Sequence, residues 1–556
     1  MKRIKFGVLA ALVSGTSLLA VTGCGTTAQT ATASQKTVNA ASAKTHPLVV
    51  IPGLNGAFAD NFNPYSPSAL SGTLGLIYQP LFYFNLVGPQ VYPLVGKSYK
   101  WSNGNRTLTV TLRQGVKWSN GTPVTVKDVV YSFDILKKFP SLDTSGIWTH
   151  LQSVSAKGSN QVVFQFHSAD VPFGQFVLDD VYIVPKQVWD KYSNPATVTN
   201  PNPIGSGPYL LNTFSSQAYT YKANPLYWGG EPKVQQLKYL DYSGNESATL
   251  ALASGKIDWT DLFFPHIHRV YVNKDPQYNH YWFSVGGTNM LYPNLKNPLL
   301  SNLSVRRAIS DAINREQLYK VGEYGYEKPA TPTALILPPE KSWLDPNLPA
   351  KDTHFTYSPA KAVKLLESAG FKRNSQGIFA SPSGTPLSFT IEVPAGWTDW
   401  DADCSLMAHD LKKIGIDATV QELSYGAYYS NITTGHYDLA MGGSNAGSTP
   451  YYLYQSLLEP KNSGNYEQWS NAATTAALNQ YRTSSNPTVQ RDAIYTLEKA
   501  VAKNLPAIPL IYGATWFEYS TKYFTGWPTA QNPYAQPAPY NYPAEGIVLT
   551  HLTPRS

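Results

Sequence analysis

The order of elements between residues 387 and 443 constrains the fold most strongly. Leu387–Val393 alternates apolar and polar residues and predicts a strand, and Asp401–Ile414 predicts a helix with acids at its start and lysines at its end. Gly415 ends that helix, and Ile416–Leu423 predicts a second strand. A strand, a helix and a strand in this order form a βαβ unit, so we expect a mixed α/β fold with parallel strands.

Two loops follow predicted strands in this region. Residues 394–400 follow the first strand, and residues 442–447 follow a short predicted strand at Tyr437–Met441. Ligands of open α/β sheets bind outside the carboxyl ends of the strands. We therefore expect the two loops, which are rich in Gly, Trp and amide groups, to point into one crevice.

Other elements are also clear from the sequence. Thr107–Leu112 alternates with period two and predicts a strand. Thr125 is the expected N-cap of a helix that begins at Val126, and Ser358 is the expected N-cap of another that stops before Gly370. No fixed-period repeat occurs, and no apolar stretch of 18 residues follows residue 47.

The composition excludes several classes of protein. Hydrophobic residues make up 42% of the chain and charged residues only 14%, which argues against both a multi-span membrane protein and wholesale disorder. The net charge of +7 is scattered along the chain, so we expect no nucleic-acid partner. The two cysteines, Cys24 and Cys404, exclude a disulfide framework and a cysteine-rich zinc site.

The amino-terminal segment has the pattern of a bacterial lipoprotein leader. Met1–Lys5 is basic, Phe6–Val21 is mostly apolar, and small residues precede Cys24, as in a lipobox. We expect residues 1–23 to be removed as a signal peptide and Cys24 to be lipidated. Residues 25–46 are rich in Thr, Ala, Ser and Gln and predict a flexible tether. The body is then expected to be extracytoplasmic, lipid-anchored to the outer face of the cell membrane or periplasmic.

Several short segments stand in an order that is typical of one family. They are residues 61–64 with 77–82, 112–129, 203–209, 304–315, 365–371 and 411–416. On these segments the chain resembles the extracellular solute-binding proteins of ABC importers, family 5, the oligopeptide-binding class. The resemblance extends from about residue 47 to residue 550.

The resemblance implies a periplasmic-binding-protein-like α/β fold with two lobes, an extra amino-terminal subdomain and a ligand cleft between the lobes. Lobe one is expected over residues 47–285 plus 510–556, with 87–198 as the extra subdomain, and lobe two over 286–509. The crossings between them are expected near Gly286–Asn289 and Pro509–Trp516. The implied mechanism is hinge closure on a ligand by a monomer, followed by delivery to an ABC permease.

The nature of the ligand stays open between two classes. The resemblance implies that peptide binders of the family pair a buried α-ammonium with an Asp in the loop after the strand at 437–441, but this loop has no acid and Asn445 is its nearest match. Oligosaccharides (cello-, xylo- or manno-) need aromatic faces and neutral amides instead. We favour an oligopeptide, with an oligosaccharide as the alternative. The candidate ligand-binding residues are Trp397, Trp400, Asn445, Ser444, Trp259 and Asn289.

The sequence lacks the catalytic motifs of several common enzyme classes. It has no Gly-x-Ser-x-Gly elbow, no His-Glu-x-x-His helix and no phosphate-binding loop. Asp399, Asp401 and Asp403 are interpreted as acids near a helix start, and Cys404 as a buried apolar residue. We expect no catalytic residues, metal or cofactor; a secreted hydrolase is the alternative of a different class. The low charge content also suggests a protein suited to an acidic exterior.

Overall fold

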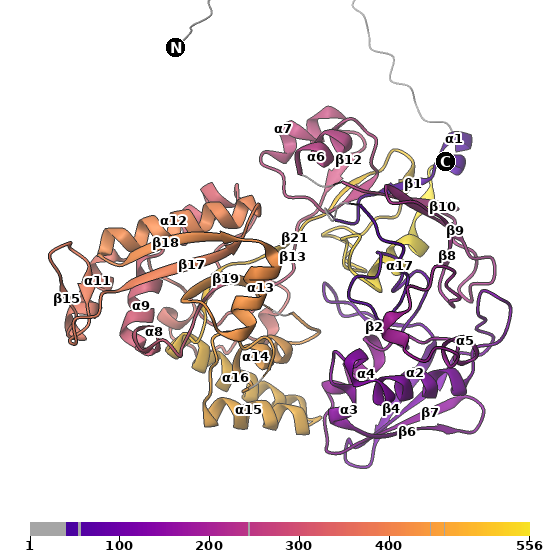
Figure 1. The fold of residues 1–556 in the computed structure, drawn as a ribbon, viewed down its shortest axis with the longest axis horizontal. Coiled ribbons are helices and arrows are strands. Elements are labelled where there is room, and N and C mark those ends of the chain that lie inside the picture. The colour runs from indigo at the N-terminus through magenta and orange to yellow at the C-terminus, as the bar shows by residue number, and fades with distance from the viewer. Residues whose placement is uncertain (1–39, 54–56, 243–244, 445, 461) are drawn as a thin grey trace, which may run out of the picture. The chain divides into compact units, whose positions relative to one another are not determined.

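The computed structural model describes residues 40–53, 57–242, 245–444, 446–460 and 462–556, and residues 39–556 form one compact unit. This unit contains three sheets of four or more strands, together with helices (Figure 1). We call the part built on the seven-stranded and four-stranded sheets lobe one, and the part built on the five-stranded sheet lobe two. No helix in the described ranges is both long enough and apolar enough to cross a membrane.

The seven-stranded sheet of lobe one separates two hydrophobic cores. Its order is β12 (Asn279–Tyr281), β22 (Glu518–Ser520), β11 (Trp259–Thr260), β1 (Leu48–Val50), β10 (Gln236–Leu240), β9 (Ala218–Ala223) and β8 (Tyr209–Phe214). Because side chains alternate along β1, Leu48 and Val50 join the large core on one face, while Val49 joins a smaller core on the other. The smaller core is covered by α6 (Asn245–Ala253) and α7 (Ile267–Val270).

The four-stranded antiparallel sheet of lobe one has the order β4 (Gly96–Ser102), β5 (Thr107–Leu112), β7 (Gln161–Phe166) and β6 (Leu151–Lys157). The predicted strand at 107–112 is confirmed. The neighbouring helix α2 spans Val126–Lys138, and Asp128 Oδ2 accepts hydrogen bonds from the backbone N–H and the hydroxyl of Thr125 at 2.8 Å. The predicted N-cap is therefore also confirmed.

Three of the family-like segments meet in lobe one. The backbone N–H of Gly207 donates to Ile77 O at 2.9 Å, and the N–H of Ser119 donates to Gly205 O at 2.8 Å. A Cβ on Gly205 would lie 2.0 Å from Ile77 O, and one on Gly207 would lie 2.2 Å from Leu76 O. Glycine is needed at both positions because the two backbones approach too closely for a side chain.

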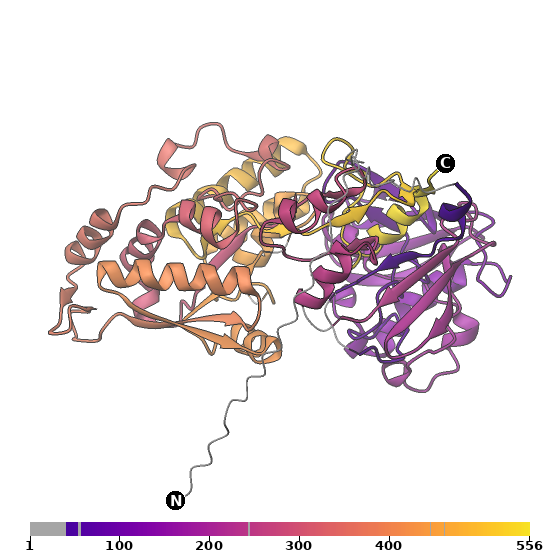
Figure 2. The ribbon, with the colours of Figure 1, turned by 90° about the horizontal axis from the view of Figure 1, so that it is seen from above.

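The five-stranded sheet of lobe two has helices on both faces (Figure 2). Its order is β18 (Asp417–Leu423), β17 (Ser388–Pro394), β19 (Leu439–Gly443), β14 (Asn289–Pro293) and β20 (Ile508–Ile511). One face packs on α9 (Leu303–Ala312), α11 (Pro359–Ser368) and α12 (Thr398–Ile414). The other face packs on α13 (Tyr425–Thr434), α14 (Pro450–Leu458), α15 (Ala472–Thr483) and α16 (Pro487–Asn504).

The predicted βαβ unit is confirmed, with shifted ends. β17 pairs with β18 and with β19 in parallel, so the carboxyl ends of β17 and β19 lie at the same edge of the sheet. The predicted loop at 394–400 is wrong in length, since β17 includes Pro394 and α12 begins at Thr398. Asp399 and Asp401 lie in the first turn, where acids favour helix formation, and this explains the earlier start.

Two neighbouring segments connect the lobes. β13 (Ser284–Val285) pairs antiparallel with β21 (Ala514–Thr515). Next to this pair, Gly286 N donates to Gly513 O at 2.8 Å, and Gly513 N donates to Gly287 O at 3.1 Å. The two connections thus run side by side through the region in which the crossings are expected.

The other elements are short. The remaining helices are α1 (Ala40–Thr45), α3 (Ile147–His150), α4 (Phe173–Asp179), α5 (Lys186–Trp189), α8 (Pro298–Ser301), α10 (Arg315–Gln317) and α17 (Ala544–His551). The remaining strands form two-stranded pairs: β2 (Phe82–Phe84) with β3 (Val91–Pro93), β15 (Lys372–Arg373) with β16 (Phe379–Ala380), and β23 (Phe524–Thr525) with β24 (Thr553–Pro554).

Candidate functional site

A cavity of about 630 Å³ is lined by residues of both lobes. Lobe one contributes residues around β2, α2, α3 and α4, and lobe two contributes Ala446, Gly447 and Tyr452. This volume lies within the range of about 300–1,000 Å³ that is usual for small-ligand sites. The loop after β19 therefore reaches the cavity, as predicted for a loop that follows a strand. The strand predicted at Tyr437–Met441 spans Leu439–Gly443, so the loop begins two residues later than predicted.

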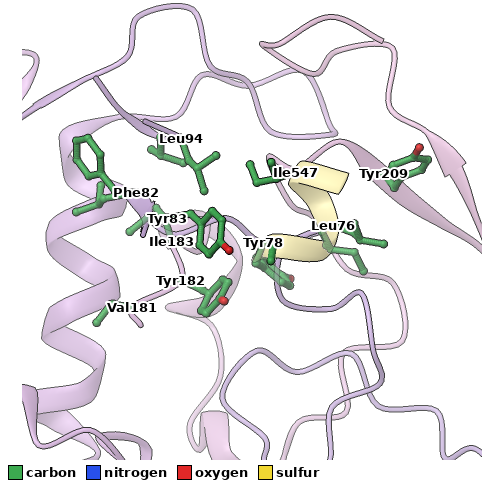
Figure 3. Packing of buried hydrophobic residues seen from close by; sticks show 14 of the residues in the cluster. Leu76, Tyr78, Phe82, Tyr83, Leu94, Val181, Tyr182, Ile183, Tyr209 and Ile547 are labelled. Carbon is green, nitrogen blue, oxygen red and sulfur yellow. The ribbon is translucent and has the colours of Figure 1, made fainter. Parts of the chain in front are cut away.

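Aromatic side chains form much of the cavity wall. They are Tyr65, Tyr83, Phe84, Phe176, Tyr182, Tyr452 and Tyr542. Figure 3 shows that Tyr83 and Tyr182 of this wall also pack in the large hydrophobic core of lobe one. Tyr182 is only 7% exposed, and its ring lies 6.4 Å from that of Tyr542. The wall offers flat apolar faces together with phenolic hydroxyl groups, which suits ligands of mixed polarity.

Three carboxyl groups belong to the lining. The two oxygens of the Asp143 carboxylate accept hydrogen bonds from the backbone N–H groups of Ile147 and Trp148, at 2.7 and 2.9 Å, at the start of α3. Asp179 and Asp180 stand at the carboxyl end of α4. Burial raises the pKa of Asp179 well above its ordinary range, and the neighbouring Asp180 raises it further. The side chain of Asp180 has exposed surface, but the surrounding protein partly desolvates its carboxyl group, and this desolvation raises its pKa to about 6.

The two lobes touch beside the cavity. The hydroxyl of Tyr452 donates to Pro172 O at 2.8 Å, and the Tyr452 ring lies 5.6 Å from that of Phe176 in an edge-to-face contact. Both rings also line a second cavity of about 620 Å³. The Phe176–Tyr452 contact therefore lies at the boundary between the two cavities.

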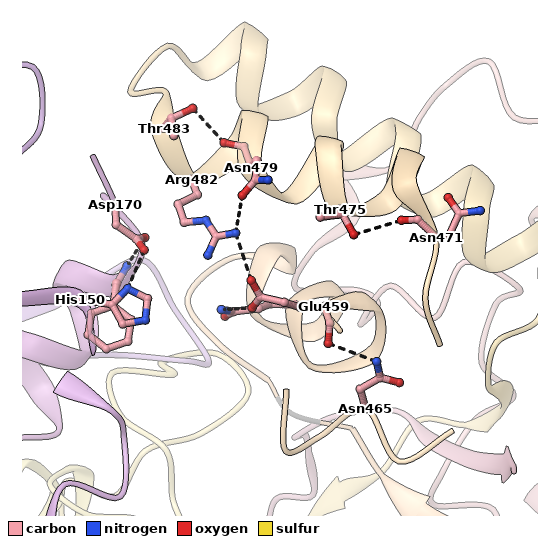
Figure 4. A network of polar contacts seen from close by, with 11 residues as sticks. His150, Asp170, Glu459, Asn465, Asn471, Thr475, Asn479, Arg482 and Thr483 are labelled. Carbon is pink, nitrogen blue, oxygen red and sulfur yellow. Dashed lines mark hydrogen bonds and ion pairs between the residues drawn. The ribbon is translucent and has the colours of Figure 1, made fainter. Parts of the chain in front are cut away.

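A polar network surrounds the second cavity (Figure 4). Arg482 pairs with Glu459 at 3.0 Å in lobe two, and His150 pairs with Asp170 at 3.0 Å in lobe one. A backbone hydrogen bond of 3.3 Å joins the two halves, from Val171 N to Arg482 O. Beside the two cavities, the contact between the lobes thus includes a few hydrogen bonds and the Phe176–Tyr452 aromatic pair.

Buried acids lie next to the two connecting segments. The carboxyl group of Glu327 accepts from the side-chain amide of Asn289 at 2.9 Å and from the backbone N–H of Ala514. The carboxyl groups of Glu323 and Asp403 are also buried, burial raises the pKa of both, and the charge of Asp403 raises that of Glu323 further. Glu327 thereby links both connections to lobe two.

The two predicted tryptophans occupy a different part of lobe two. Trp397 is 43% exposed just before α12, and its ring lies 4.8 Å from that of Trp400 in an edge-to-face contact. Trp400 is half-buried against the core between the sheet and α12. Neither belongs to the lining of the 630 Å³ cavity, so only one of the two predicted loops contributes to that site.

The other predicted residues have varied positions. Ser444 Oγ accepts from Thr288 N at 2.9 Å, which ties the loop after β19 to the first connecting segment. Asn289 is buried at Glu327. Trp259 has no exposed surface and donates through Nε1 to Pro537 O at 2.9 Å. Its expected role as a ligand-stacking residue is therefore corrected to core packing, because no face is available. Asn445 and Cys24 lie outside the described residues.

Sequence reasoning missed the residues of lobe one that line the cavity. Asp179, Asp180 and Tyr182 come from segments far in sequence from the loop at 442–447. The available signal was two adjacent acids directly after the apolar run of α4. That signal does not show which side chains of lobe two lie opposite, because the contact depends on tertiary structure.

The comparisons with known proteins agree with this architecture. Residues 90–465 match the bacterial extracellular solute-binding proteins, family 5. The oligopeptide-binding protein AppA of Bacillus subtilis is 25% identical over 435 residues, which cover 75% of this chain and 77% of AppA. Protein XP55 of Streptomyces lividans is 26% identical over 407 residues, which cover 72% of each chain.

A solved structure extends the similarity to the whole fold. It is a periplasmic oligopeptide-binding protein of an oligopeptide ABC transporter from Thermotoga maritima with bound mannohexaose. That protein is 27% identical to this chain, with a TM-score of 0.81, and the match covers 92% of this chain and 98% of the other. The predicted two-lobed α/β fold is confirmed, and the chain belongs to the family 5 extracellular solute-binding proteins, which are transport binding proteins.

Proposed function

We propose that this protein is the lipid-anchored solute-binding component of an ABC importer and that it captures oligopeptides outside the cell membrane. The observation that carries the proposal is the 630 Å³ cavity, whose wall is built from both lobes. A ligand that contacts both lobes favours the arrangement in which they approach each other. Such a ligand can therefore signal its presence to a permease through the relative position of the lobes.

The proposal includes the organisation inferred from the sequence. Residues 1–23 are the signal peptide, Cys24 carries the lipid and residues 25–46 form the tether. Lobe one spans residues 47–285 and 510–556, with 87–198 as its extra subdomain, and lobe two spans 286–509. The crossings near Gly286–Asn289 and Pro509–Trp516 act as the hinge, and hydrogen bonds between Gly286, Gly287 and Gly513 support this role. The protein acts as a monomer and delivers its ligand to the permease.

Peptides fit the cavity in two respects. Its aromatic wall suits apolar side chains, and its phenolic hydroxyls suit a peptide backbone. The name of AppA, a relative of similar length, also supports an oligopeptide ligand. We therefore place oligopeptides first.

An oligosaccharide is the second candidate. The related Thermotoga maritima protein holds mannohexaose although it is named as an oligopeptide-binding protein. The exposed Trp397 beside Trp400 would provide a stacking surface for a long sugar. A secreted hydrolase is the remaining alternative, and it would consume its substrate.

A thermal-shift screen separates these functions. The purified protein is heated with tri- to pentapeptides, cello-, xylo- and manno-oligosaccharides, or buffer alone. A ligand at 100 times its Kd adds about 2.7 kcal/mol to the free energy of unfolding. Peptide-specific shifts, with the peptide recovered intact, are expected. A raised midpoint of unfolding with oligosaccharides alone would indicate that the protein serves sugar uptake. Loss of the added ligand over time would indicate an enzyme.

A further inference from the structure

The cavity lining contains three carboxyl groups and no Lys, Arg or His among the described residues that form it. Asp143 is engaged with the amino end of α3, whereas Asp179 and Asp180 lie at the carboxyl end of α4. The unsatisfied backbone carbonyls there add negative potential to that of the two acids. None of the described residues that line the cavity therefore offers the two acids a positive charge.

Hydrogen bonding leaves the pair incompletely satisfied. Asp179 Oδ2 accepts from Phe84 N at 3.2 Å, but Asp179 Oδ1 is buried and has no hydrogen-bond partner. Asp180 Oδ2 accepts from Ser145 Oγ at 3.1 Å. Neither acid takes part in an ion pair within the described ranges. A buried carboxyl oxygen without a donor is unfavourable unless a ligand supplies one.

Two tyrosine hydroxyls of the same cavity lining are also unpartnered among the described residues. Tyr182 is 7% exposed and lines the cavity, and its hydroxyl forms no hydrogen bond with the described residues. The hydroxyl of Tyr65, also in the lining, is buried without a partner. Burial raises the pKa of Tyr182 well above its ordinary value, and Asp179 and Asp180 raise it further, which places the phenol in the field of the two acids.

We propose that Asp179 and Asp180 form a cation subsite that selects peptides bearing an ammonium or guanidinium group inside the cavity. The cation pairs with the carboxylate of Asp180, which has exposed surface, and Asp179 beside it adds negative potential as it ionises. Leu74, Leu136 and Phe84 add apolar side chains to the lining of the same cavity. The inference rests on the proposed peptide-binding function and names the class of peptide.

The subsite also compensates for the loop after β19. Residues 442–447 carry no acid in lobe two, so a buried cation finds no partner there. Asp179 and Asp180 supply negative charge from lobe one to the same cavity that Ala446 and Gly447 of lobe two line. A peptide whose cation is held by lobe one and whose other atoms contact lobe two would join the lobes.

The test is isothermal titration calorimetry with matched peptides at pH 7.5. The four probes are Leu-Lys-Tyr-Ala, its N-acetyl form, Leu-Gln-Tyr-Ala and N-acetyl-Leu-Gln-Tyr-Ala. The full-length protein is compared with Asp179→Asn, Asp180→Asn and the control Asp60→Asn, which removes an exposed carboxylate outside the lining. Circular dichroism checks that each variant is folded, and Asp180→Asn serves where Asp179→Asn fails to fold.

We expect the doubly neutral peptide to bind at least tenfold more weakly than the cationic peptide. We also expect the Asn variants, but not Asp60→Asn, to remove that difference. Loss of affinity on acetylation assigns the subsite to the α-ammonium, and loss on replacing Lys by Gln assigns it to a side chain. Equal affinities for charged and neutral peptides would overturn the subsite while leaving peptide binding intact. Binding of none of the peptides would overturn the proposed function, and the subsite with it.

Discussion

Glu545 gives the stability of lobe one a defined dependence on pH. It lies in α17, is 1% exposed and accepts a hydrogen bond from the hydroxyl of Tyr239. Burial raises its pKa from 4.5 to about 8. No basic residue contacts this carboxyl group through an ion pair in the described ranges. The folded protein therefore holds Glu545 protonated at neutral pH, while the unfolded chain ionises it.

The sign of the effect follows from proton uptake. Between the unfolded pKa and the folded pKa the native state binds one more proton, so stability is full at low pH and is lost as pH rises. Each unit of pKa difference corresponds to about 1.4 kcal/mol. The rise from 4.5 to about 8 therefore predicts a loss of roughly 4–5 kcal/mol between pH 4 and pH 9 from this group alone.

The substitution Glu545→Gln tests this reasoning. The amide is neutral at all pH values, has nearly the same size and still accepts from Tyr239. We expect the free energy of unfolding of the variant, relative to the unaltered protein, to increase steadily from pH 4.5 to pH 8.5. Urea unfolding followed by near-ultraviolet circular dichroism of the tyrosines measures it. Glu231→Gln, which removes an exposed carboxylate, is the control.

A difference between variant and unaltered protein that does not change with pH would refute the reasoning. The same holds for a difference that shrinks as pH rises. Burial also raises the pKa of Glu340 to about 8 and that of Glu498 to about 7, so the whole chain is expected to gain stability on mild acidification. A steep loss of stability below pH 4.5 would contradict the suggestion of an acidic exterior.

Three further predictions concern the interlobe contact, the backbone and the anchor. Tyr452→Phe removes the hydrogen bond to Pro172 O and is expected to weaken ligand affinity about fivefold, measured by calorimetry, since such a bond contributes about 1 kcal/mol; an unchanged Kd would contradict this. Gly205→Ala places a Cβ 2.0 Å from Ile77 O and is expected to destabilise the fold by about 1–3 kcal/mol in urea unfolding; an unchanged midpoint would show that the backbone adapts. Cys24→Ser is expected to release the protein from the membrane fraction of producing cells, and retention in that fraction would contradict the lipid anchor.

The sequence predicted those parts of the fold that depend on local signals. The βαβ unit, the strand at 107–112 and the N-caps at Thr125 and Ser358 all appear in the structure, because period, caps and stop signals lie within a few residues. α12 begins three residues earlier than predicted since Thr398 precedes acids that also suit the first turn. Element ends are decided by such small competing preferences.

The cavity wall was harder to predict. Trp259 and the tryptophans at 397 and 400 were chosen because aromatic residues near loops suit a ligand, but the fold buries the first in a core. Tyr182 and Tyr452 come from different lobes and meet at the cavity only through tertiary packing. Periodicity and spacing carry no information about such a contact, since the two residues are remote in the chain.

The most direct measurement of the central claim is calorimetric titration of the purified protein with a mixed tetrapeptide library and, separately, with mannohexaose. We expect saturable peptide binding with one site per chain, no turnover, and a negative heat-capacity change from burial of the aromatic wall. Saturable heat from mannohexaose with none from peptides would contradict it, and would identify a sugar-binding protein instead.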